Sequence, residues 1–191
     1  MKTADVAVLV IDMNNDHIKN NMPFTSERLR SKIPNIRKFL DEARKFGIPI
    51  IYVTDSHRAN DWIFSRKTVK PYAIEESWGE EIIQELKPHE DDYVVKKRRF
   101  SGFFGTDLDL YLRERKINTL LLVGGPTHVS IRYTAVDAYS LRYNVFVLKD
   151  CTDSSTKEFF ESALEDMFFT TRIKSINYFR KFRANLLHNM Q

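Results

Sequence analysis

Short apolar runs rich in β-branched residues alternate with amphipathic segments along most of the chain. The clearest runs cover residues 5–12, 48–54, 119–123 and 145–148, and polar or turn-forming residues follow each of them. Runs of this length that are apolar at nearly every position predict strands buried on both faces of a sheet. Strands that alternate with helices predict βαβ units, and therefore a mostly parallel sheet covered by helices on both sides.

Weaker patterns complete this alternation. Further strands are expected over residues 93–96 and 173–176, and helices over residues 26–46, 78–86, 106–115, 129–141, 159–169 and 178–188. Gly47 is expected to end the first helix, because glycine readily adopts the left-handed backbone of a helix C-terminus. Residues 55–77 form a long loop rich in aromatic residues. Since long loops in compact domains are often functional, we interpret it as the cover of a pocket.

The 191 residues are predicted to form a single domain, 1–191, because domains typically hold about 50 to 250 residues. The single cysteine excludes an internal disulfide. No apolar run approaches the ~20 residues of a membrane span, and the N-terminus lacks a signal-peptide pattern, so we expect a soluble cytoplasmic protein. The net charge of +4 is spread among acidic residues except at residues 96–99, which argues against nucleic acid as a partner.

Three predicted strands end next to residues that suit catalysis. Asp12 ends the first run, Lys97 ends the third strand, and Ser130 follows a Gly-Gly-Pro turn at the start of a helix. Because the carboxyl ends of parallel strands share one edge of the sheet, these side chains are expected to meet there. A carboxylate held by a lysine is a candidate acid/base group, and a hydroxyl at a helix N-terminus is a candidate nucleophile.

Each of these residues also has a purely structural interpretation. A strand-end Asp often forms a turn, a serine at a helix start is usually a cap, and Lys97 lies in a basic run that solvent could cover. The two-residue period of a strand nevertheless predicts that either Lys96 or Lys97 points inward. Taken singly, none of the three residues identifies a function.

Taken together, they resemble the isochorismatase-like hydrolase superfamily, which includes nicotinamidases, N-carbamoylsarcosine amidases and isochorismatases. The resemblance lies in the stretches Val8–Asp16, Lys97–Gly125 and Thr127–Asp150, and it spans nearly the whole chain. It implies a three-layer αβα sandwich with a six-stranded, mostly parallel, Rossmann-like sheet. It also implies a homodimer or homotetramer that acts on a small-molecule substrate without a cofactor.

By this resemblance Asp12 is the general acid/base and Lys97 is its partner, which keeps it oriented and ionised. The nucleophilic cysteine of the family falls at Ser130. Ser130 is then a slower nucleophile, an engineered replacement of cysteine, or no nucleophile at all, as in isochorismatases. The single cysteine, Cys151, falls where the family usually has a small structural residue.

The resemblance leaves three functions open. The first is hydrolysis of an amide or ureido C–N bond through Asp12, Lys97 and position 130. The second is hydrolysis of a vinyl ether by Asp12 as general acid without a covalent nucleophile, which His128 favours because isochorismatases carry histidine there. The third is a catalytically weak binding protein of the same fold.

The turn and the loops contribute further candidates. Gly125–Pro126 is expected to be a cis peptide, since proline lowers the cost of the cis form to about 0.5–1 kcal/mol. Gly125, Pro126 and Thr127 are expected to shape an oxyanion-binding turn. Trp62, Phe103 and His128 are the candidate substrate contacts.

No tightly bound metal is expected. The nicotinamidases of the family bind a metal through an Asp-x-His pair and a further histidine, and Asp55 with His57 matches that pair. Residues 69–77, where the further histidine is expected, contain none. Two ligands bind zinc weakly, because catalytic zinc sites usually use three protein ligands.

Overall fold

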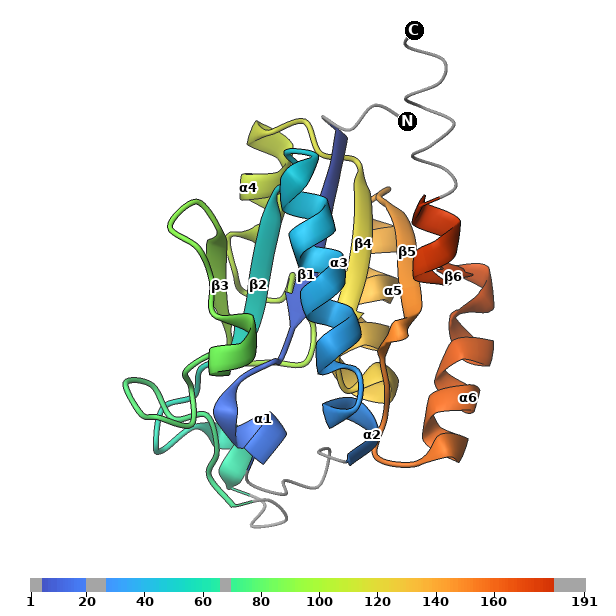
Figure 1. Ribbon diagram of the computed structural model, residues 1–191. Helices are drawn as coiled ribbons and strands as arrows, with labels where there is room; N and C mark the ends of the chain where they lie inside the picture. The colour runs from blue at the N-terminus through green and yellow to red at the C-terminus, as the bar shows by residue number, and fades with distance from the viewer. Residues whose placement is uncertain (1–4, 20–26, 66–69, 181–191) are drawn as a thin grey trace, which may run out of the picture.

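A six-stranded parallel sheet forms the centre of the computed structural model, which describes residues 5–19, 27–65 and 70–180 (Figure 1). The strand order is β3-β2-β1-β4-β5-β6, and every neighbouring pair is parallel. The predicted α/β class and the six-stranded Rossmann-like sheet are therefore confirmed. The strands are β1 (Val6–Ile11), β2 (Ile50–Asp55), β3 (Tyr93–Lys97), β4 (Thr119–Gly124), β5 (Asn144–Thr152) and β6 (Arg172–Lys174).

Helices cover both faces of this sheet and complete the three layers (Figure 1). The helix α3 (Ile33–Lys45) packs on one face, and its apolar side chains recur at intervals of three and four. The opposite face is covered by α4 (Leu108–Glu114), α5 (Arg132–Ser140) and α6 (Lys157–Asp166). Two short helices, α1 (Asn15–Lys19) and α2 (Glu27–Arg30), lie near the carboxyl ends of the strands.

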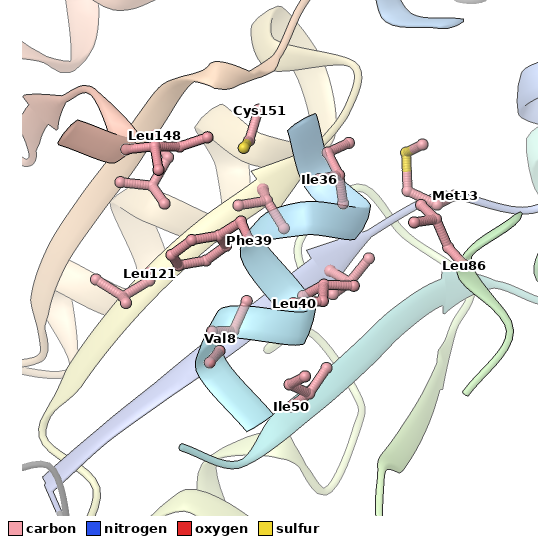
Figure 2. Close-up of a cluster of buried hydrophobic side chains, with 14 of the residues drawn as sticks. Val8, Met13, Ile36, Phe39, Leu40, Ile50, Leu86, Leu121, Leu148 and Cys151 are labelled. Carbon is pink, nitrogen blue, oxygen red and sulfur yellow. The ribbon is translucent and has the colours of Figure 1, made fainter. Parts of the chain in front are cut away.

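The layer under α3 is a continuous apolar cluster (Figure 2). Phe39 is completely buried at its centre, between α3 and the strands that carry Val8 and Leu121. Burial of a side chain of this kind contributes about 1.5–3 kcal/mol. Cys151 belongs to the same cluster, so it serves the packing of the core.

Two predicted helices differ from the structure. The helix expected over residues 26–46 is divided into α2 and α3 by a turn at residues 31–32, because Pro34 has no N–H to continue a helix from α2. The helix expected over residues 78–86 is wrong. Backbone atoms of Gly79, Glu81 and Ile83 instead bond to residues 13–16, and only the 3₁₀ turn Gln84–Leu86 is helical there.

The other expected elements are found with small shifts. The helical pattern over residues 129–141 becomes a π-helical turn, Thr127–Ile131, followed directly by α5. The pattern over residues 159–169 becomes α6 and the 3₁₀ turn Met167–Phe169. Of the last expected helix, residues 178–180 are helical in a segment that begins at residue 176, and the part from 181 to 188 lies outside the described residues. No helix in the described ranges is long and apolar enough to cross a membrane.

Gly124 gives a direct test of the close packing between β4 and β1. Its φ is +101°, and an added Cβ would lie 2.2 Å from the carbonyl oxygen of Ile11. We expect Gly124→Ala to lower the free energy of unfolding by about 2–5 kcal/mol, because backbone strain and overpacking add. Gly105 also has a positive φ, +67°, with nothing within 4 Å of an added Cβ. Gly105→Ala should therefore lower the free energy of unfolding by only about 1–2 kcal/mol, as measured by urea denaturation. Equal losses in Gly124→Ala and Gly105→Ala would contradict the close packing of Gly124 against β1.

Candidate active site

The candidate catalytic residues meet where the strand order reverses. β1 and β4 are neighbours in the sheet, while the chain continues from β1 to β2 on the other side. In open parallel sheets, ligands bind outside the carboxyl ends of the strands at such a switch point. Asp12 directly follows β1, and the turn with Ser130 follows β4.

Asp12 is completely buried and held from two sides. Its φ of +48° turns the chain out of β1, and its own N–H donates to the Val53 carbonyl at 2.9 Å. Its Oδ1 accepts the backbone N–H of Asp55 at 3.0 Å. Its Oδ2 accepts the Lys97 ammonium at 2.9 Å. The carboxylate is therefore fixed in one orientation at the end of the sheet.

Lys97 is the inward-facing member of the basic run, as the strand period allowed. It is completely buried, whereas the Lys96 side chain is 57 % exposed and pairs with Glu80 at 2.7 Å. Arg99 pairs with Asp61 at 3.0 Å. Three of the four cationic side chains in residues 96–99 thus form ion pairs with carboxylates of this chain. Little positive charge of this run is left to bind the phosphate backbone of a nucleic acid.

Asp55 is a second carboxylate of the site, although the sequence pattern predicted only a polar loop residue or a substrate contact at this position. It lies opposite Lys97 in the register between β2 and β3, and its Oδ1 accepts the ammonium at 2.5 Å. Its Oδ2 accepts Nε2 of His17 from α1 at 2.9 Å. Lys97 therefore joins two carboxylates, and His17 extends the chain of contacts by one residue.

Ser130 completes the predicted constellation. It lies 2 % exposed in the π-helical turn before α5, and its side chain is close enough to Asp12 to lower the pKa of that carboxyl group. The amino end of α5 directs a positive dipole toward this position, which favours developing negative charge. The structure thus brings Asp12, Lys97 and Ser130 together from three segments of the chain.

The net electrostatic effect on Asp12 differs from the expectation. Burial and the neighbouring Asp55 raise the pKa of Asp12, and the charges of Lys97 and His17 together with the Ser130 hydrogen bond only partly offset this rise. Burial opposes ionisation of Asp55 as well, but Lys97 and His17 outweigh it and hold the pKa of Asp55 well below its ordinary value. The surroundings therefore favour the ionised form of Asp55 more than that of Asp12, and Asp12 is the carboxyl group suited to exchange a proton.

The turn after β4 has the expected cis peptide, but its donors are used within the fold. Gly125–Pro126 is cis, which confirms that prediction. The N–H of Gly125 donates to the Ile11 carbonyl at 3.0 Å, and that of Thr127 donates to the Asp153 carbonyl at 2.9 Å. Pro126 has no N–H. These three residues shape the turn, the N–H groups of Gly125 and Thr127 are used within the fold, and binding of an oxyanion by N–H groups near residues 127–130 stays a prediction.

The three predicted substrate contacts are placed differently. Phe103 is partly buried and packs against Tyr143, which precedes β5, and substrate contact by Phe103 stays a prediction. The His128 ring stacks on Phe159 of α6 with centroids 4.8 Å apart. Trp62 is 64 % exposed in the 3₁₀ turn Trp62–Phe64, which follows β2. For His128 and Trp62, substrate contact stays a prediction.

The residues around Asp55 do not fit a divalent metal ion. Asp12, His17 and Asp55 place ligand atoms within 4.8 Å of one another, but the Lys97 ammonium already lies between the two carboxylates. The Tyr72 ring packs edge-on against both His17 and His57, with centroids 5.2 and 5.0 Å apart. The Tyr72 ring thus covers both imidazoles, and the Lys97 ammonium supplies the cation between the two carboxylates.

The comparisons agree with this geometry. Residues 6–176 match the sequence model of the Isochorismatase domain family. A crystal structure of an isochorismatase-like hydrolase from Alkaliphilus metalliredigens superposes with a TM-score of 0.87 at 37 % identity, covering 93 % of this chain and 98 % of that one. With the fold, the switch-point site and the match over most of the chain, the protein belongs to the isochorismatase family of hydrolases.

Two curated relatives differ in what their names state. A ureidoacrylate amidohydrolase of Agrobacterium fabrum is 30 % identical over 187 residues, covering 85 % of this chain and 82 % of its own. A protein of Arabidopsis thaliana named a probable inactive nicotinamidase is 34 % identical over 176 residues, covering 85 % of this chain and 88 % of its own. Family membership is thus clear, and the substrate follows from neither name.

Proposed function

We propose that this protein hydrolyses an amide or ureido C–N bond of a small molecule. The observation that carries the proposal is the buried pair of Asp12 and Lys97, 2.9 Å apart, with the Ser130 side chain close enough to lower the pKa of Asp12. A nucleophile within hydrogen-bond reach of a base, with the base held by a third group, is the arrangement that covalent hydrolysis needs. The ureidoacrylate amidohydrolase among the relatives supports the choice of bond.

The reaction follows from the contacts. Asp12 takes the hydroxyl proton of Ser130 while the oxygen attacks the carbonyl carbon, and the C–N bond breaks as Asp12 returns that proton to the leaving nitrogen. A water molecule then gives a proton to Asp12 while its oxygen attacks the ester formed at Ser130, and Asp12 returns that proton to the Ser130 oxygen as the ester C–O bond breaks. A raised pKa suits Asp12 for this exchange, because a general base works best with a pKa near the working pH.

One observation favours a second candidate function, acid-catalysed hydrolysis of a vinyl ether. Burial raises the pKa of Asp12, so this carboxyl keeps its proton to higher pH than an exposed aspartate. In that reaction Asp12 donates a proton to carbon, water adds, and Ser130 forms no bond to the substrate. The two functions differ in what they require of position 130.

Exchange of Ser130 separates the two functions. A thiol ionises more readily than a hydroxyl, so we expect Ser130→Cys to raise amide or ureido hydrolysis by about ten- to a hundredfold, and Ser130→Gly to abolish it. Product release would be measured for all three proteins with nicotinamide, N-carbamoylsarcosine, related ureido acids and isochorismate. Isochorismate hydrolysis that persists in Ser130→Gly, without a gain in Ser130→Cys, would establish the second function. Three inactive proteins would indicate a binding protein.

A further inference from the structure

We propose that Asp153 is a positioning residue that holds the turn of Ser130 in the place where it meets Asp12. This inference deepens the proposed function and rests on it for the effect on hydrolysis. Asp153 follows β5 at the carboxyl end of the sheet, and its side chain is 3 % exposed. It acts through the backbone of the turn Thr127–Ile131 rather than on the reacting atoms.

An irregularity in β5 brings its end beside this turn. Leu122 of β4 pairs with Val147 of β5. Gly124, two residues further along β4, pairs with Thr152, which is five residues further along β5. β5 therefore holds extra residues that β4 does not match, and Thr152 lies next to the point where the chain leaves β4 for the turn.

Three successive buried residues at the end of β5 bind the turn. The hydroxyls of Thr152 and Thr127 are hydrogen-bonded at 2.7 Å. The Asp153 carbonyl accepts the N–H of Thr127 at 2.9 Å. The Ser154 hydroxyl accepts the N–H of His128 at 3.3 Å. The first two residues of the turn are thus tied to the end of β5.

The carboxylate of Asp153 fixes the middle residue of these three. Its Oδ1 accepts the N–H of Ser154 at 2.8 Å and that of Arg28 Nε at 3.0 Å. Lys32 Nζ lies 3.3 Å from its Oδ2. Both cations come from α2 and the turn after it, and α2 lies beside the end of β5 (Figure 1). Asp153 cannot rotate its carbonyl away from Thr127 without straining these charged bonds.

Close packing limits the turn while this hold is intact. An added Cβ at Gly125 would lie 3.1 Å from the Asp153 carbonyl oxygen and 2.8 Å from the side chain of Leu29 in α2. The end of β5 and α2 thus enclose the start of the turn, and Arg28 joins the two through Asp153. The hold matters for a nucleophile at Ser130, because a misplacement of about 1 Å can cost about 10²-fold in rate.

Amide hydrogen exchange measures this hold without a substrate. Asp153→Asn removes the charge that bonds Arg28 and Lys32, and charge-assisted hydrogen bonds are about twice as strong as neutral ones. We expect the Thr127 and His128 amides of the folded protein to exchange about tenfold faster, because the turn opens locally more often. NMR at one pH would follow both amides. Unchanged exchange of the two would overturn the proposal.

Asp92→Asn is the matched control. Asp92 is also a buried carboxylate, 7 % exposed, which binds Arg44 at 2.6 Å and accepts the backbone N–H of His89 at 2.9 Å. It directly precedes β3, at the amino end of the strands and opposite the site. A comparable loss of global stability should therefore leave exchange at Thr127 and His128 unchanged. Equal acceleration in both variants would show a general loss of packing and would overturn the proposal.

Kinetics in a Ser130→Cys background test the effect on hydrolysis. We expect Asp153→Asn to lower kcat by about ten- to a hundredfold and to change KM by less than about twofold, because the nucleophile is displaced while substrate binding is kept. Asp92→Asn should leave both constants unchanged. An unchanged kcat together with faster exchange would overturn the positioning role. Failure of the proposed function would appear as missing turnover in Ser130→Cys itself, and exchange would then decide whether Asp153 holds the turn.

A second variant keeps the proposal testable if Asp153→Asn does not fold. Arg28→Met leaves the buried carboxylate paired with Lys32, and the arginine that it removes is 38 % exposed. We expect it to make exchange of the Thr127 amide about threefold faster, and Arg28→Lys, which keeps the charge, to restore most of the parent rate. Exchange equal to that of the parent in Arg28→Met would overturn the proposal.

Discussion

Asp12→Asn will lower the rate of hydrolysis by about 10²–10⁴-fold, which is the usual contribution of a positioned acid/base group. The amide has nearly the size of the carboxylate and can accept the N–H of Asp55, so the local fold should persist. It cannot take a proton from position 130 or return one to a leaving nitrogen. The measurement is kcat/KM for whichever substrate the Ser130 series identifies.

For Asp12→Asn we expect stability to be kept or raised, in contrast to the loss of activity. Because burial and Asp55 raise the pKa of Asp12, its protonated form favours folding, and that contribution is lost as pH rises through the folded-state pKa. At pH 7 to 8, Asp12→Asn should therefore unfold at the same or a higher urea concentration than the parent. Loss of both activity and stability would show that Asp12 supports the fold and would remove the case for catalysis.

Lys97→Met will lower the free energy of unfolding by about 3–5 kcal/mol at neutral pH, the typical cost of leaving a buried charge without its partner. The substitution leaves Asp12 and Asp55 as like charges in a site closed to solvent. The loss should shrink below about pH 5, where protonation of one carboxyl relieves the repulsion. Urea denaturation at both pH values measures it.

Lys96 is the natural control for this substitution. It is the preceding residue on β3, points outward and pairs with Glu80 near the surface. Lys96→Met should cost about 1–2 kcal/mol, less than the loss at Lys97, and leave activity unchanged, because Lys96 is 57 % exposed although its partner Glu80 is buried. Adding Asp55→Asn to Lys97→Met should recover part of the lost stability. Similar losses for both lysines would contradict the placement of Lys97.

The fold was predictable because β1, β2 and β4 are buried on both faces and are therefore apolar at nearly every position. Residues 119–123 show the pattern most clearly, since β4 lies in the interior of the sheet. The false helix over residues 78–86 arose where the segment pairs with residues 13–16, a contact distant in sequence. Local periodicity carries no information on such pairing, so a short amphipathic stretch was assigned to the wrong element.

The site was predictable only in part. Asp12, Lys97 and Ser130 each follow a recognisable strand, and the strand period limited the inward residue to Lys96 or Lys97. The position of Asp55 at the end of a strand also pointed to the site, but its bond to Lys97 depends on the register between β2 and β3. His17 had no signal in the sequence, because α1 is a five-residue helix whose direction is set by contacts with residues 79–83.

The most direct test of the central claim compares Ser130→Cys with the double variant Asp12→Asn/Ser130→Cys. The measurement is release of ammonia or amine from the amide and ureido panel, with product identified by mass spectrometry. The account predicts turnover by Ser130→Cys that falls by about 10²-fold or more when Asp12 is lost. Turnover that is unchanged without Asp12, or absent from Ser130→Cys on every amide and ureido compound, would contradict it.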